Sequence, residues 1–480
     1  MAFKDLREFI EKCRAHDEVL DVEGADWDVE LGSLAELKAE DPESQLLLFD
    51  KIKGYPAGFR VAANPFNSTK RTALGLDLPL GVGKREQVKA LRAKLKQGVT
   101  LVPPVEVETG PVKENILIGD KVDLDIFPAP RWREGDTGRY IGTGDLVIMR
   151  DPDEGWVNMA SQMVATHDKT RCAIYMSPGR HNGIIRNKYF ARGMNAPVAV
   201  VCGQSPTLEV AAGLNVPWGL SEYDYAGWLN GGPIQVTKGV TTDLPLPATA
   251  EIVLEGELVR PEEEPPIPVA RFGDWAGYYV DVEEKVPVFR VKSILYRNNP
   301  IILGNPPAVL PSSWTLGRDV HMSAVLWDEL DRQIPGVQGC WLMGEAGLRH
   351  MAVVSIKQMY GGHAKHAALA AASCNAVAYM LRYVIVVDED VDPTKINEVL
   401  WALGTRCDPE DSIDIVRGWW ASPGPDVLLS PEKRKRRQYE HSLAVITACK
   451  PFYWIKDFPP SSKLTPELEK KLKEKWSKLF

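Results

Sequence analysis

The sequence predicts a multi-domain α/β protein. Its 480 residues correspond to about three domains, or to two with elaborations, at roughly 150 residues each. Glycine (39) and proline (36) are abundant, which is typical of many turns between short strands. The pattern changes twice along the chain, from helix–strand alternation to short strands and back. We therefore expect domains at residues 1–112, 113–311 and 312–480.

The first region is expected to be a small α/β unit. Apolar residues recur on one helical face over 3–13, and a second helix is expected at 28–40. The runs VLDVEG, LLLFDKI and FRVAAN predict strands. The segment KREQVKALRAKLKQG predicts a charged helix that ends at Gly98. The proline-rich stretch LVPPVEVETGPV then indicates a linker.

Short β-rich runs dominate from about residue 115 to 300. Turn residues separate these runs at intervals close to those of a β-barrel, and some helix is expected near 183–194. The predicted strands are GDLVIMR, WVNMASQMVATH, RCAIYMS, APVAVVCG, GPIQVTKGV, ATAEIVLEGELV and PVFRVKSILYR.

Strands and helices alternate again from about residue 312. MAVVSIK and YVIVVDED predict strands, whereas HAKHAALAAASCNAVAYMLR and NEVLWALGT predict helices, which is a βαβα rhythm. The tail TPELEKKLKEKWSKLF predicts an amphipathic helix with Thr465 as its N-cap. Its apolar stripe packs either on its own domain or on a partner subunit, and comprises Leu464, Leu468, Leu472, Trp476 and Leu479.

Charge and cysteine usage argue against several classes of protein. The net charge of −8 gives no basic footprint for nucleic acid, and the run KRKRR (433–437) is expected to be a solvated surface. Seven scattered cysteines without a CxxC pair indicate reduced thiols. No apolar run is long enough to span a membrane, and the start MAFKDLREFIEKC has no signal-peptide core. We expect a soluble, cytoplasmic protein without a membrane partner.

The sequence contains no short motif that is by itself typical of a catalytic or nucleotide-binding site. There is no P-loop, GxSxG or HExxH. Asn158, His181 and Glu222 lie at loop-like positions in the β-rich region; an amide oxygen, an imidazole and a carboxylate are plausible ligands for Mn²⁺ or Mg²⁺. The pair His363 and His366 is expected to mark a helix start rather than a metal site.

The chain resembles the UbiD family of (de)carboxylases essentially end to end. The most specific stretches are TGDLVIMRDPDEGWVN, PGRH, GLSEYDYAG and LPATAEIVLEGEL, followed by FGDWAGYY, RNNP and VLWALGTRCDPE. The resemblance implies an N-terminal α/β domain, a split β-barrel that binds prenylated FMN, and a C-terminal α/β domain used in oligomerisation. It implies reversible decarboxylation of an aromatic acid, phenolic, aryl or aryl-CoA, with CO₂ released or fixed.

The resemblance also assigns cofactor positions. Asn158, His181 and Glu222 match the ligands of Mn²⁺ (or Mg²⁺/Fe²⁺), which in turn holds the cofactor phosphate, with K⁺ nearby. Further positions match the flavin site, namely Thr143, Ala160, Ser161, Gln162, Met163, Arg180 and Leu214. The family Lys near SLAVITACKP falls on Leu443, and the possible substitutes are Lys435, Lys450 and His441.

The catalytic positions depart from the family pattern. The usual Arg is Met163 and the first acid is Val269, while the second acid is kept as Asp274. Losing both partners of an ion pair avoids a stranded buried charge, so we expect a more apolar substrate pocket formed by Met163, Val269 and Trp275. Asp274 is expected to donate and accept the proton, with a pKa raised by its apolar surroundings.

Two functional hypotheses follow from the resemblance. The first is a prenylated-FMN-dependent aromatic acid decarboxylase that depends on a flavin prenyltransferase for its cofactor and forms a homodimer or hexamer. The second, motivated by Met163 and Val269, is a non-catalytic accessory subunit of a multi-subunit carboxylase.

Overall fold

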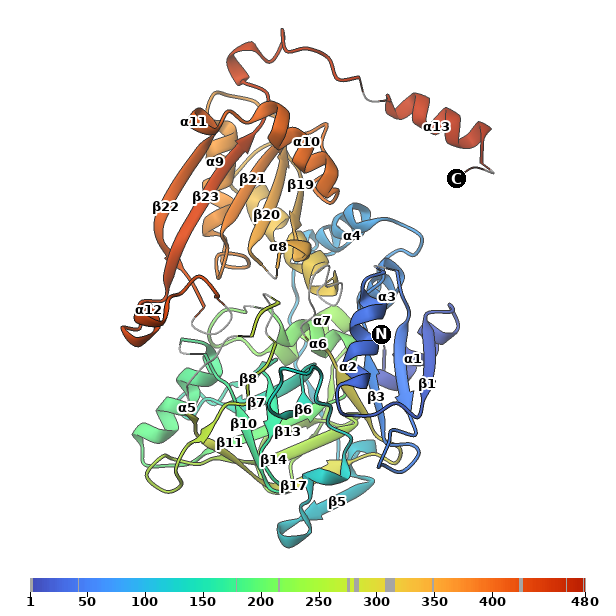
Figure 1. Ribbon diagram of the computed structural model, residues 1–480, viewed down its shortest axis with the longest axis vertical. Coiled ribbons are helices and arrows are strands. Elements are labelled where there is room, and N and C mark those ends of the chain that lie inside the picture. The colour runs from blue at the N-terminus through green and yellow to red at the C-terminus, as the bar shows by residue number, and fades with distance from the viewer. Residues whose placement is uncertain are drawn as a thin grey trace.

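The computed structural model describes residues 3–41, 43–177, 179–214, 216–273, 277–279, 285–306, 316–347, 349–422, 426–462, 464–477 and 479. These residues form a three-domain α/β protein (Figure 1). The N-terminal domain lies beside the central sheet, and the C-terminal sheet lies above both. The predicted fold class is therefore confirmed at the level of three α/β domains.

The N-terminal domain is built on a four-stranded sheet with the order β1-β2-β3-β18. Helix α1 begins after Asp5, whose side chain accepts a hydrogen bond from the Glu8 amide, and it buries one apolar face. Strand β18 comes from much later in the chain and pairs in parallel with β3. The elements are α1 (Leu6–Arg14), β1 (Val19–Glu23), α2 (Glu30–Ala39), β2 (Leu46–Asp50), β3 (Arg60–Ala63), α3 (Thr69–Leu76), α4 (Lys84–Lys96) and β18 (Ile301–Gly304).

The central domain is a nine-stranded, antiparallel sheet with the order β6-β9-β10-β17-β14-β11-β7-β8, and β5 also pairs with β17. Among the described residues the end strands β6 and β8 do not pair with each other, so the sheet stays open and no closed barrel forms. Its strands are β5 (Asn115–Ile118), β6 (Arg139–Gly142), β7 (Asp145–Arg150), β8 (Val157–Ala160), β9 (Val164–Thr166), β10 (Arg171–Ile174), β11 (Ala196–Cys202), β14 (Ile252–Leu258) and β17 (Val288–Tyr296).

Short elements surround this sheet. A three-stranded sheet has the order β13-β12-β4, and a two-stranded one joins β15 to β16. The β-rich runs predicted from the sequence all contain strands of the structure. The remaining central elements are β4 (Val105–Glu106), α5 (His181–Ala191), α6 (Pro206–Ala212), α7 (Glu222–Asn230), β12 (Gln235–Lys238), β13 (Pro245–Pro247), β15 (Ile267–Pro268) and β16 (Lys285–Val286).

The C-terminal domain is a five-stranded sheet with the order β19-β20-β21-β23-β22. The βαβα rhythm is confirmed, but the helix predicted over 363–382 ends at Ser373. Cys374 takes extended backbone and residues 374–382 turn back toward the central domain. The elements are α8 (Leu316–Asp331), β19 (Val337–Leu342), β20 (Met351–Ile356), α9 (His363–Ser373), β21 (Tyr383–Asp388), α10 (Ile396–Arg406), α11 (Pro409–Ser412), β22 (Ile413–Trp420), α12 (Pro431–Lys435) and β23 (Glu440–Ala448).

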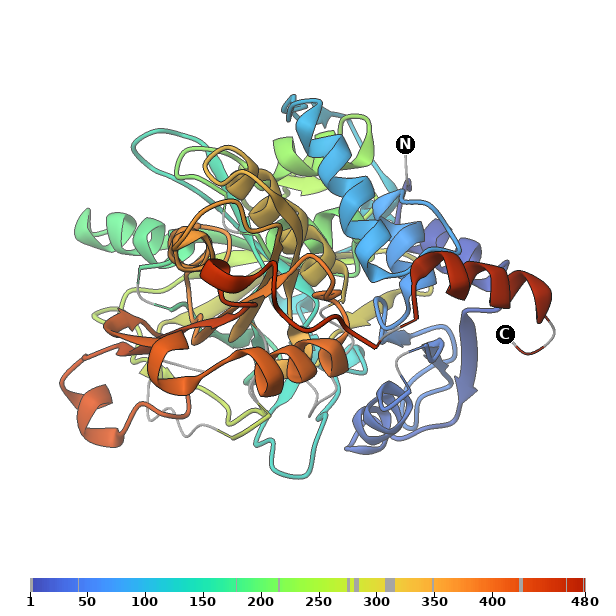
Figure 2. The same cartoon turned by 90° about the horizontal axis from the view of Figure 1, so that it is seen from above.

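The last helix, α13 (Pro466–Lys475), lies at the end of an extended arm (Figures 1 and 2). Thr465 caps it as predicted, because its hydroxyl accepts a hydrogen bond from the Leu468 amide. Leu468 remains 43 % exposed and Trp476 remains 50 % exposed. The prediction that this stripe packs on its own domain is therefore wrong, whereas its docking on a partner subunit stays a prediction.

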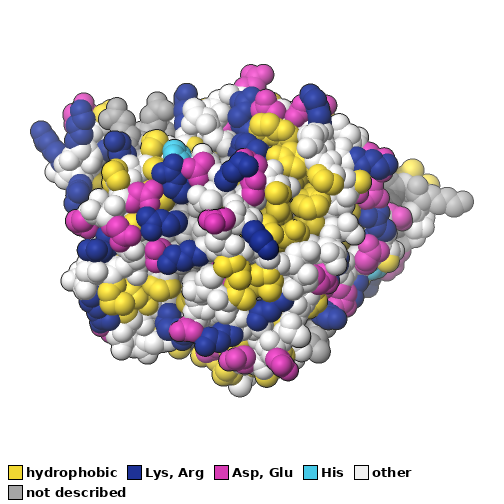
Figure 3. All heavy atoms as spheres, turned by 90° about the horizontal axis from the view of Figure 1, so that it is seen from below, with side chains coloured by type: hydrophobic (Ala, Val, Ile, Leu, Met, Phe, Trp, Pro, Cys, Tyr) yellow, Lys and Arg dark blue, Asp and Glu magenta, His cyan; other side chains and the backbone are white. Residues whose placement is uncertain are grey.

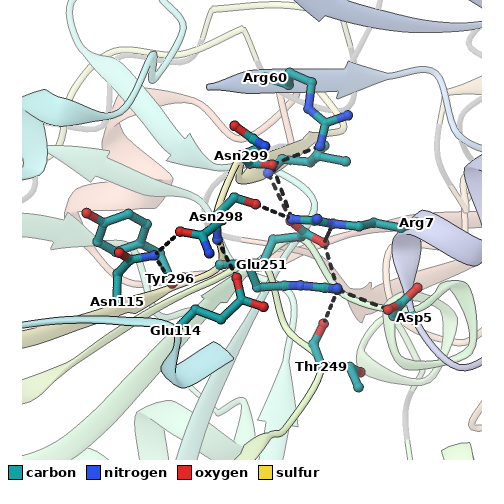
Figure 4. Close-up of polar contacts among 12 residues, drawn as sticks. Asp5, Arg7, Arg60, Glu114, Asn115, Thr249, Glu251, Tyr296, Asn298 and Asn299 are labelled. Atoms are coloured by element: carbon teal, nitrogen blue, oxygen red, sulfur yellow. Dashed lines mark hydrogen bonds and ion pairs between the residues drawn. The ribbon is translucent and has the colours of Figure 1, made fainter. Parts of the chain in front are cut away.

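A buried ion network fastens α1 to the central domain (Figure 4). The Arg7 guanidinium donates to both oxygens of Glu251, at 2.8 Å each. Arg297 donates to Asp5 at 2.9 Å and to Glu251 at 3.2 Å. The Ile301 amide donates to the same carboxylate at 3.2 Å. Glu251 thus joins an N-terminal helix, the central sheet and strand β18.

One face of the molecule and the cysteines bear on the predicted charge distribution and on the predicted reduced thiols. Seen from below, the molecule shows positive and negative side chains interspersed, without a field of one sign (Figure 3). All seven cysteines are free thiols. In the part of the chain that the structure describes, no helix is both long and apolar enough to cross a membrane.

Candidate active site

A cavity of about 240 Å³ lies where the central and C-terminal domains meet. Every position predicted to bind the cofactor or metal lines it, namely Thr143, Asn158, Ala160, Ser161, Gln162, Met163, Arg180, His181, Leu214 and Glu222. The C-terminal domain closes the other side with residues that the sequence reasoning did not identify, among them Arg318, Arg349, Asn375, Tyr379, Met380 and Trp420. The fold therefore brings together positions that lie far apart in sequence.

Three short elements place the predicted metal ligands. Asn158 lies on β8 and is buried, His181 is the first residue of α5, and Glu222 is the first residue of α7. The Asn158 Oδ1 atom lies 3.0 Å from His181 Nδ1. Glu222 Oε2 accepts a hydrogen bond of 2.8 Å from the Met159 amide, next to Asn158. Strand β8 thus links the amide–imidazole pair to the carboxylate.

Asn182 orients the Asn158 amide. The Asn182 side-chain nitrogen donates to Val147 O at 3.1 Å and to Gln162 Oε1 at 3.3 Å. Its oxygen therefore faces Asn158 and accepts a hydrogen bond of 2.7 Å from Asn158 Nδ2. This contact fixes which end of the Asn158 amide is the oxygen, and it leaves that oxygen on the His181 side. No signal in the sequence marked Asn182 apart from its place beside His181.

The electrostatics of the three groups match a cation site. Burial raises the pKa of Glu222 to about 8, and burial and then Arg180 lower the pKa of His181. Both shifts favour uncharged side chains when no cation is bound. An amide oxygen, a neutral imidazole and a carboxylate are a donor set that fits a divalent ion such as Mn²⁺. Among the described residues, no group of three or more His, Cys, Asp or Glu could hold a metal instead.

Two tryptophans hold the His181 ring. Trp156 and Trp218 meet it edge to face, with ring centroids 5.6 and 5.1 Å away. They also contact each other at 5.0 Å, and Lys188 lies over the Trp218 ring. Because the ring is packed on these sides, its orientation is set before any ligand binds.

In the described lining, Arg180, Arg318 and Arg349 contribute positive charge to the cavity. Arg318 pairs with the buried Glu209 at 3.1 Å. Arg349 donates to Gly213 O at 2.7 Å, and burial together with Arg180 and Arg318 lowers its pKa to about 9. A buried guanidinium surrounded by like charge is a natural partner for an anion.

The three substitutes considered for the family Lys lie elsewhere. None of them is among the residues that line the cavity. Lys450 pairs with Asp390 and His441 contacts Asp426, while Lys435 is exposed on α12. The cationic side chains at the cavity are therefore arginines.

The predicted catalytic and substrate positions have different outcomes. Met163 lines the cavity. Val269 does not belong to the cavity's described lining; it packs against the same hydrophobic core that Met163 contacts. Asp274 and Trp275 lie outside the described residues. The segment just before them is anchored by Asp136, which accepts a hydrogen bond of 3.1 Å from the Gly273 amide.

His363 and His366 behave as the sequence predicted. His363 begins α9 and stacks on Tyr360, whose hydroxyl bonds His366 Nδ1 at 3.0 Å. The pair marks a helix start.

Models of the three domains of 3-octaprenyl-4-hydroxybenzoate carboxy-lyase match this chain in order. The N-terminal domain matches residues 10–95, the Rift-related domain 104–309 and the C-terminal domain 318–424. The chain is 31 % identical to the pyrrole-2-carboxylic acid decarboxylase of Pseudomonas aeruginosa, over 84 % of this chain and 83 % of that protein. It is also 31 % identical to the phenolic acid decarboxylase of Bacillus subtilis, over 90 % and 89 %.

Solved structures show the same relationship. The vanillic acid decarboxylase of Sedimentibacter hydroxybenzoicus superposes with a TM-score of 0.84 at 26 % identity, covering 99 % of both chains. The UbiD-class enzyme HmfF from Pelotomaculum thermopropionicum, in complex with FMN, also gives 0.84 at 26 % identity, covering 97 % of this chain and 98 % of that one. The chain belongs to the UbiD family of prenylated-FMN-dependent decarboxylases. It is a UbiD-like carboxy-lyase, as its sequence predicted.

Proposed function

We propose that this protein catalyses the reversible decarboxylation of an aromatic carboxylic acid in the cavity between its central and C-terminal domains. One observation carries the proposal: the positions predicted to hold the metal and the flavin all line this one cavity. The names of the relatives support the substrate class, because pyrrole-2-carboxylic, phenolic and vanillic acids are all aromatic acids.

The residues present fit the cofactor and the cation. Asn158, His181 and Glu222 would hold Mn²⁺ (or Mg²⁺/Fe²⁺), with K⁺ nearby, and Arg180 would face the anionic end of the flavin. The flavin surface would lie along Thr143, Leu214 and the segment 160–163, which starts at the last residue of β8. When bound, prenylated FMN supplies the electron sink that decarboxylation requires. We propose that the open central sheet acts as the two halves of a split barrel around it.

The chain's own part in the reaction is to bind, orient and protonate. Arg318 and Arg349 line the cavity and would attract the substrate carboxylate. In the forward direction the bond to the carboxylate breaks, CO₂ leaves, and Asp274 delivers the proton that takes its place on the ring carbon. Asp274 then regains a proton from solvent, and the carboxylation direction reverses these steps.

The altered pocket narrows the substrate class. Met163 replaces a cation with an apolar side chain on the cavity wall, and Trp275 would extend the apolar surface, whereas Val269 belongs to the hydrophobic core that Met163 also contacts. A flat phenolic acid, aryl acid or aryl-CoA thioester suits such a wall. A phenolic substrate is favoured further, because its hydroxyl donates electron density to the ring carbon that loses CO₂.

The proposal also covers the oligomeric state of the protein and the source of its cofactor. We expect a homodimer or hexamer, in which the exposed stripe of α13 docks on a partner subunit. A flavin prenyltransferase would supply the cofactor, and the protein would work in the cytoplasm.

The second candidate function is that of a non-catalytic accessory subunit of a carboxylase complex. The replacement of the family's Arg and Glu by Met163 and Val269 favours this alternative.

Hydrogen–deuterium exchange separates the two candidates. The holoenzyme, purified anaerobically after co-expression with a flavin prenyltransferase, is incubated in D₂O with a panel of phenolic acids, aryl acids and aryl-CoA esters. We expect deuterium to enter the ring at the position that carried the carboxylate. Asp274→Asn should abolish that exchange, and Asp243→Asn, at an exposed pair with Lys238, should not change it.

Two other results of the exchange experiment would contradict parts of the proposal. Unchanged exchange in Asp274→Asn would remove that residue from its role. A wild-type protein that holds flavin and metal but exchanges no substrate of the panel would favour the accessory subunit.

A further inference from the structure

A second cavity of about 340 Å³ lies where the three domains meet. Its walls come from the end of α4 and the loop after it, from the segment leading into α7, and from one face of α8. Residues 321, 325 and 328 of α8 line the cavity, and their spacing of four and three residues places them on one face of the helix. The apolar lining comprises Leu95, Val99, Leu101, Leu214, Val216, Pro217, Leu220, Met322, Val325 and Ala376.

This cavity adjoins the candidate active site. Among the described residues, Leu214, Val216 and Asn375 line both cavities, so their side chains belong to the partition between them. The start of α7 lies at the same boundary, since Glu222 lines the first cavity and Ser221 lines the second. The two cavities are therefore neighbours within the fold.

One buried polar pair faces the second cavity. His321 is 1 % exposed, and its Nε2 lies 2.7 Å from the Tyr225 hydroxyl. Its Nδ1 is buried and has no hydrogen-bond partner. Burial lowers the pKa of His321 to about 3 and raises the pKa of Tyr225 above its ordinary value, so both groups are neutral at pH 7. A neutral imidazole with a free nitrogen can bond a hydroxyl group of a ligand.

The charges around the cavity decide what kind of ligand fits. Asp328 and Glu329 are both in the lining, and the exposed Arg332 pairs with Asp328. Glu329 accepts a hydrogen bond from Cys374. The described lining of the second cavity therefore carries two carboxylates and one guanidinium, whereas the described lining of the first cavity carries three arginines and the carboxyl group of Glu222. An aromatic acid is favoured in the first cavity, and a neutral aromatic molecule in the second.

We propose that the second cavity binds a neutral hydroxylated aromatic molecule, with its ring against the apolar wall and its hydroxyl on His321. This is the class of molecule that decarboxylation of a phenolic acid releases, so the cavity would receive the product across the Leu214–Val216–Asn375 partition. That role in the reaction rests on the function proposed above; the binding site itself does not require turnover.

Ligand binding to the holoenzyme tests the site, with fluorine NMR titrations of 4-fluorophenol, 4-fluorobenzoate and fluorobenzene. Val99→Trp fills the cavity from a wall position that is 41 % exposed, and Val240→Trp is its control at a position 37 % exposed elsewhere. We expect Val99→Trp to weaken 4-fluorophenol binding by about tenfold or more and to leave 4-fluorobenzoate unaffected, whereas Val240→Trp changes neither. Val325→Trp, on α8, repeats the test from the opposite wall.

The hydrogen-bonding part of the proposal has its own test. His321→Phe keeps an aromatic ring but removes the buried nitrogen, so the preference for 4-fluorophenol over fluorobenzene should disappear. A preference that persists in this variant would overturn the assignment of His321. Equal 4-fluorophenol affinity in the wild type and Val99→Trp would overturn the site itself, as would no binding to the wild type. Either result can occur while decarboxylation is intact, and loss of decarboxylation with intact 4-fluorophenol binding would count against the proposed function alone.

Discussion

Glu251→Gln should loosen the attachment of the N-terminal domain. The Glu251 carboxylate is fully buried and receives hydrogen bonds from Arg7, Arg297 and the Ile301 amide (Figure 4). The substitution keeps the size of the side chain and one oxygen, but it removes the negative charge that both guanidinium groups face. Arg297 is only 11 % exposed and has Asp5 as its remaining acidic partner.

The structure sets the size of the effect. Removing one partner of a buried ion pair costs about 3–5 kcal/mol. Arg7 is 30 % exposed and recovers part of its hydration, and glutamine keeps one acceptor, so we expect a loss of about 2–3 kcal/mol in stability. The loss should concentrate on α1 and β18, because the network joins these elements to the central sheet.

Urea unfolding together with hydrogen exchange measures this loss by region. The unfolding midpoint should fall, and amides of α1 should exchange faster than those of the C-terminal sheet. Glu23→Gln is the control, because its pair with Lys51 is exposed on both sides and should leave both readouts unchanged. If Glu251→Gln behaves like Glu23→Gln, the network does not hold the domains together.

Three further changes test other parts of the structure. Asn182→Leu should lower metal affinity about 10–100-fold without unfolding the protein, because Asn158 loses the partner that orients its oxygen; elemental analysis and thermal melting check this, and full metal occupancy would contradict it. His321 has a folded-state pKa of about 3 against an ordinary value near 6.5, so the unfolded chain binds the extra proton and stability should fall as pH drops below about 6.5, by up to about 1.4 kcal/mol per unit; His321→Gln should flatten that part of the pH profile, and an identical profile would count against it. Burial opposes ionisation of Asp390, but Arg406 outweighs it and lowers the pKa of Asp390 to about 2, so the stability from this pair is present above about pH 4 and lost as pH falls toward 2. Asp390→Asn should therefore cost about 1–2 kcal/mol at pH 7 and little at pH 2, and an equal cost at both pH values would refute the assignment.

The sequence predicted the elements well where a periodic pattern had a physical cause. The apolar face of 3–13 became α1, and each β-rich run of the central region contains a strand. It failed at residues 374–382, because alanine-rich sequence favours helix locally while the chain has to turn there to face the central domain. Asn375, Tyr379 and Met380 consequently line the candidate active-site cavity and do not extend α9.

For the candidate site, the sequence predicted only the residues that match the family's motifs. Asn158, His181 and Glu222 carry the resemblance and converge on one cavity. Arg318 and Arg349 gave no signal, because a buried arginine has the same sequence appearance as an exposed one. The two arginines reach the cavity only because separate domains meet there, and that meeting depends on tertiary packing that no local pattern encodes.

The most direct test of the account measures flavin and metal in one preparation. Wild type, Glu222→Gln and the exposed control Glu262→Gln are co-expressed with a flavin prenyltransferase, purified anaerobically, and analysed by absorption spectroscopy and elemental analysis. We predict about one flavin and one divalent ion per chain in the wild type and Glu262→Gln, and loss of the metal in Glu222→Gln. A wild-type protein that retains neither would contradict the central claim that this cavity is the decarboxylase site.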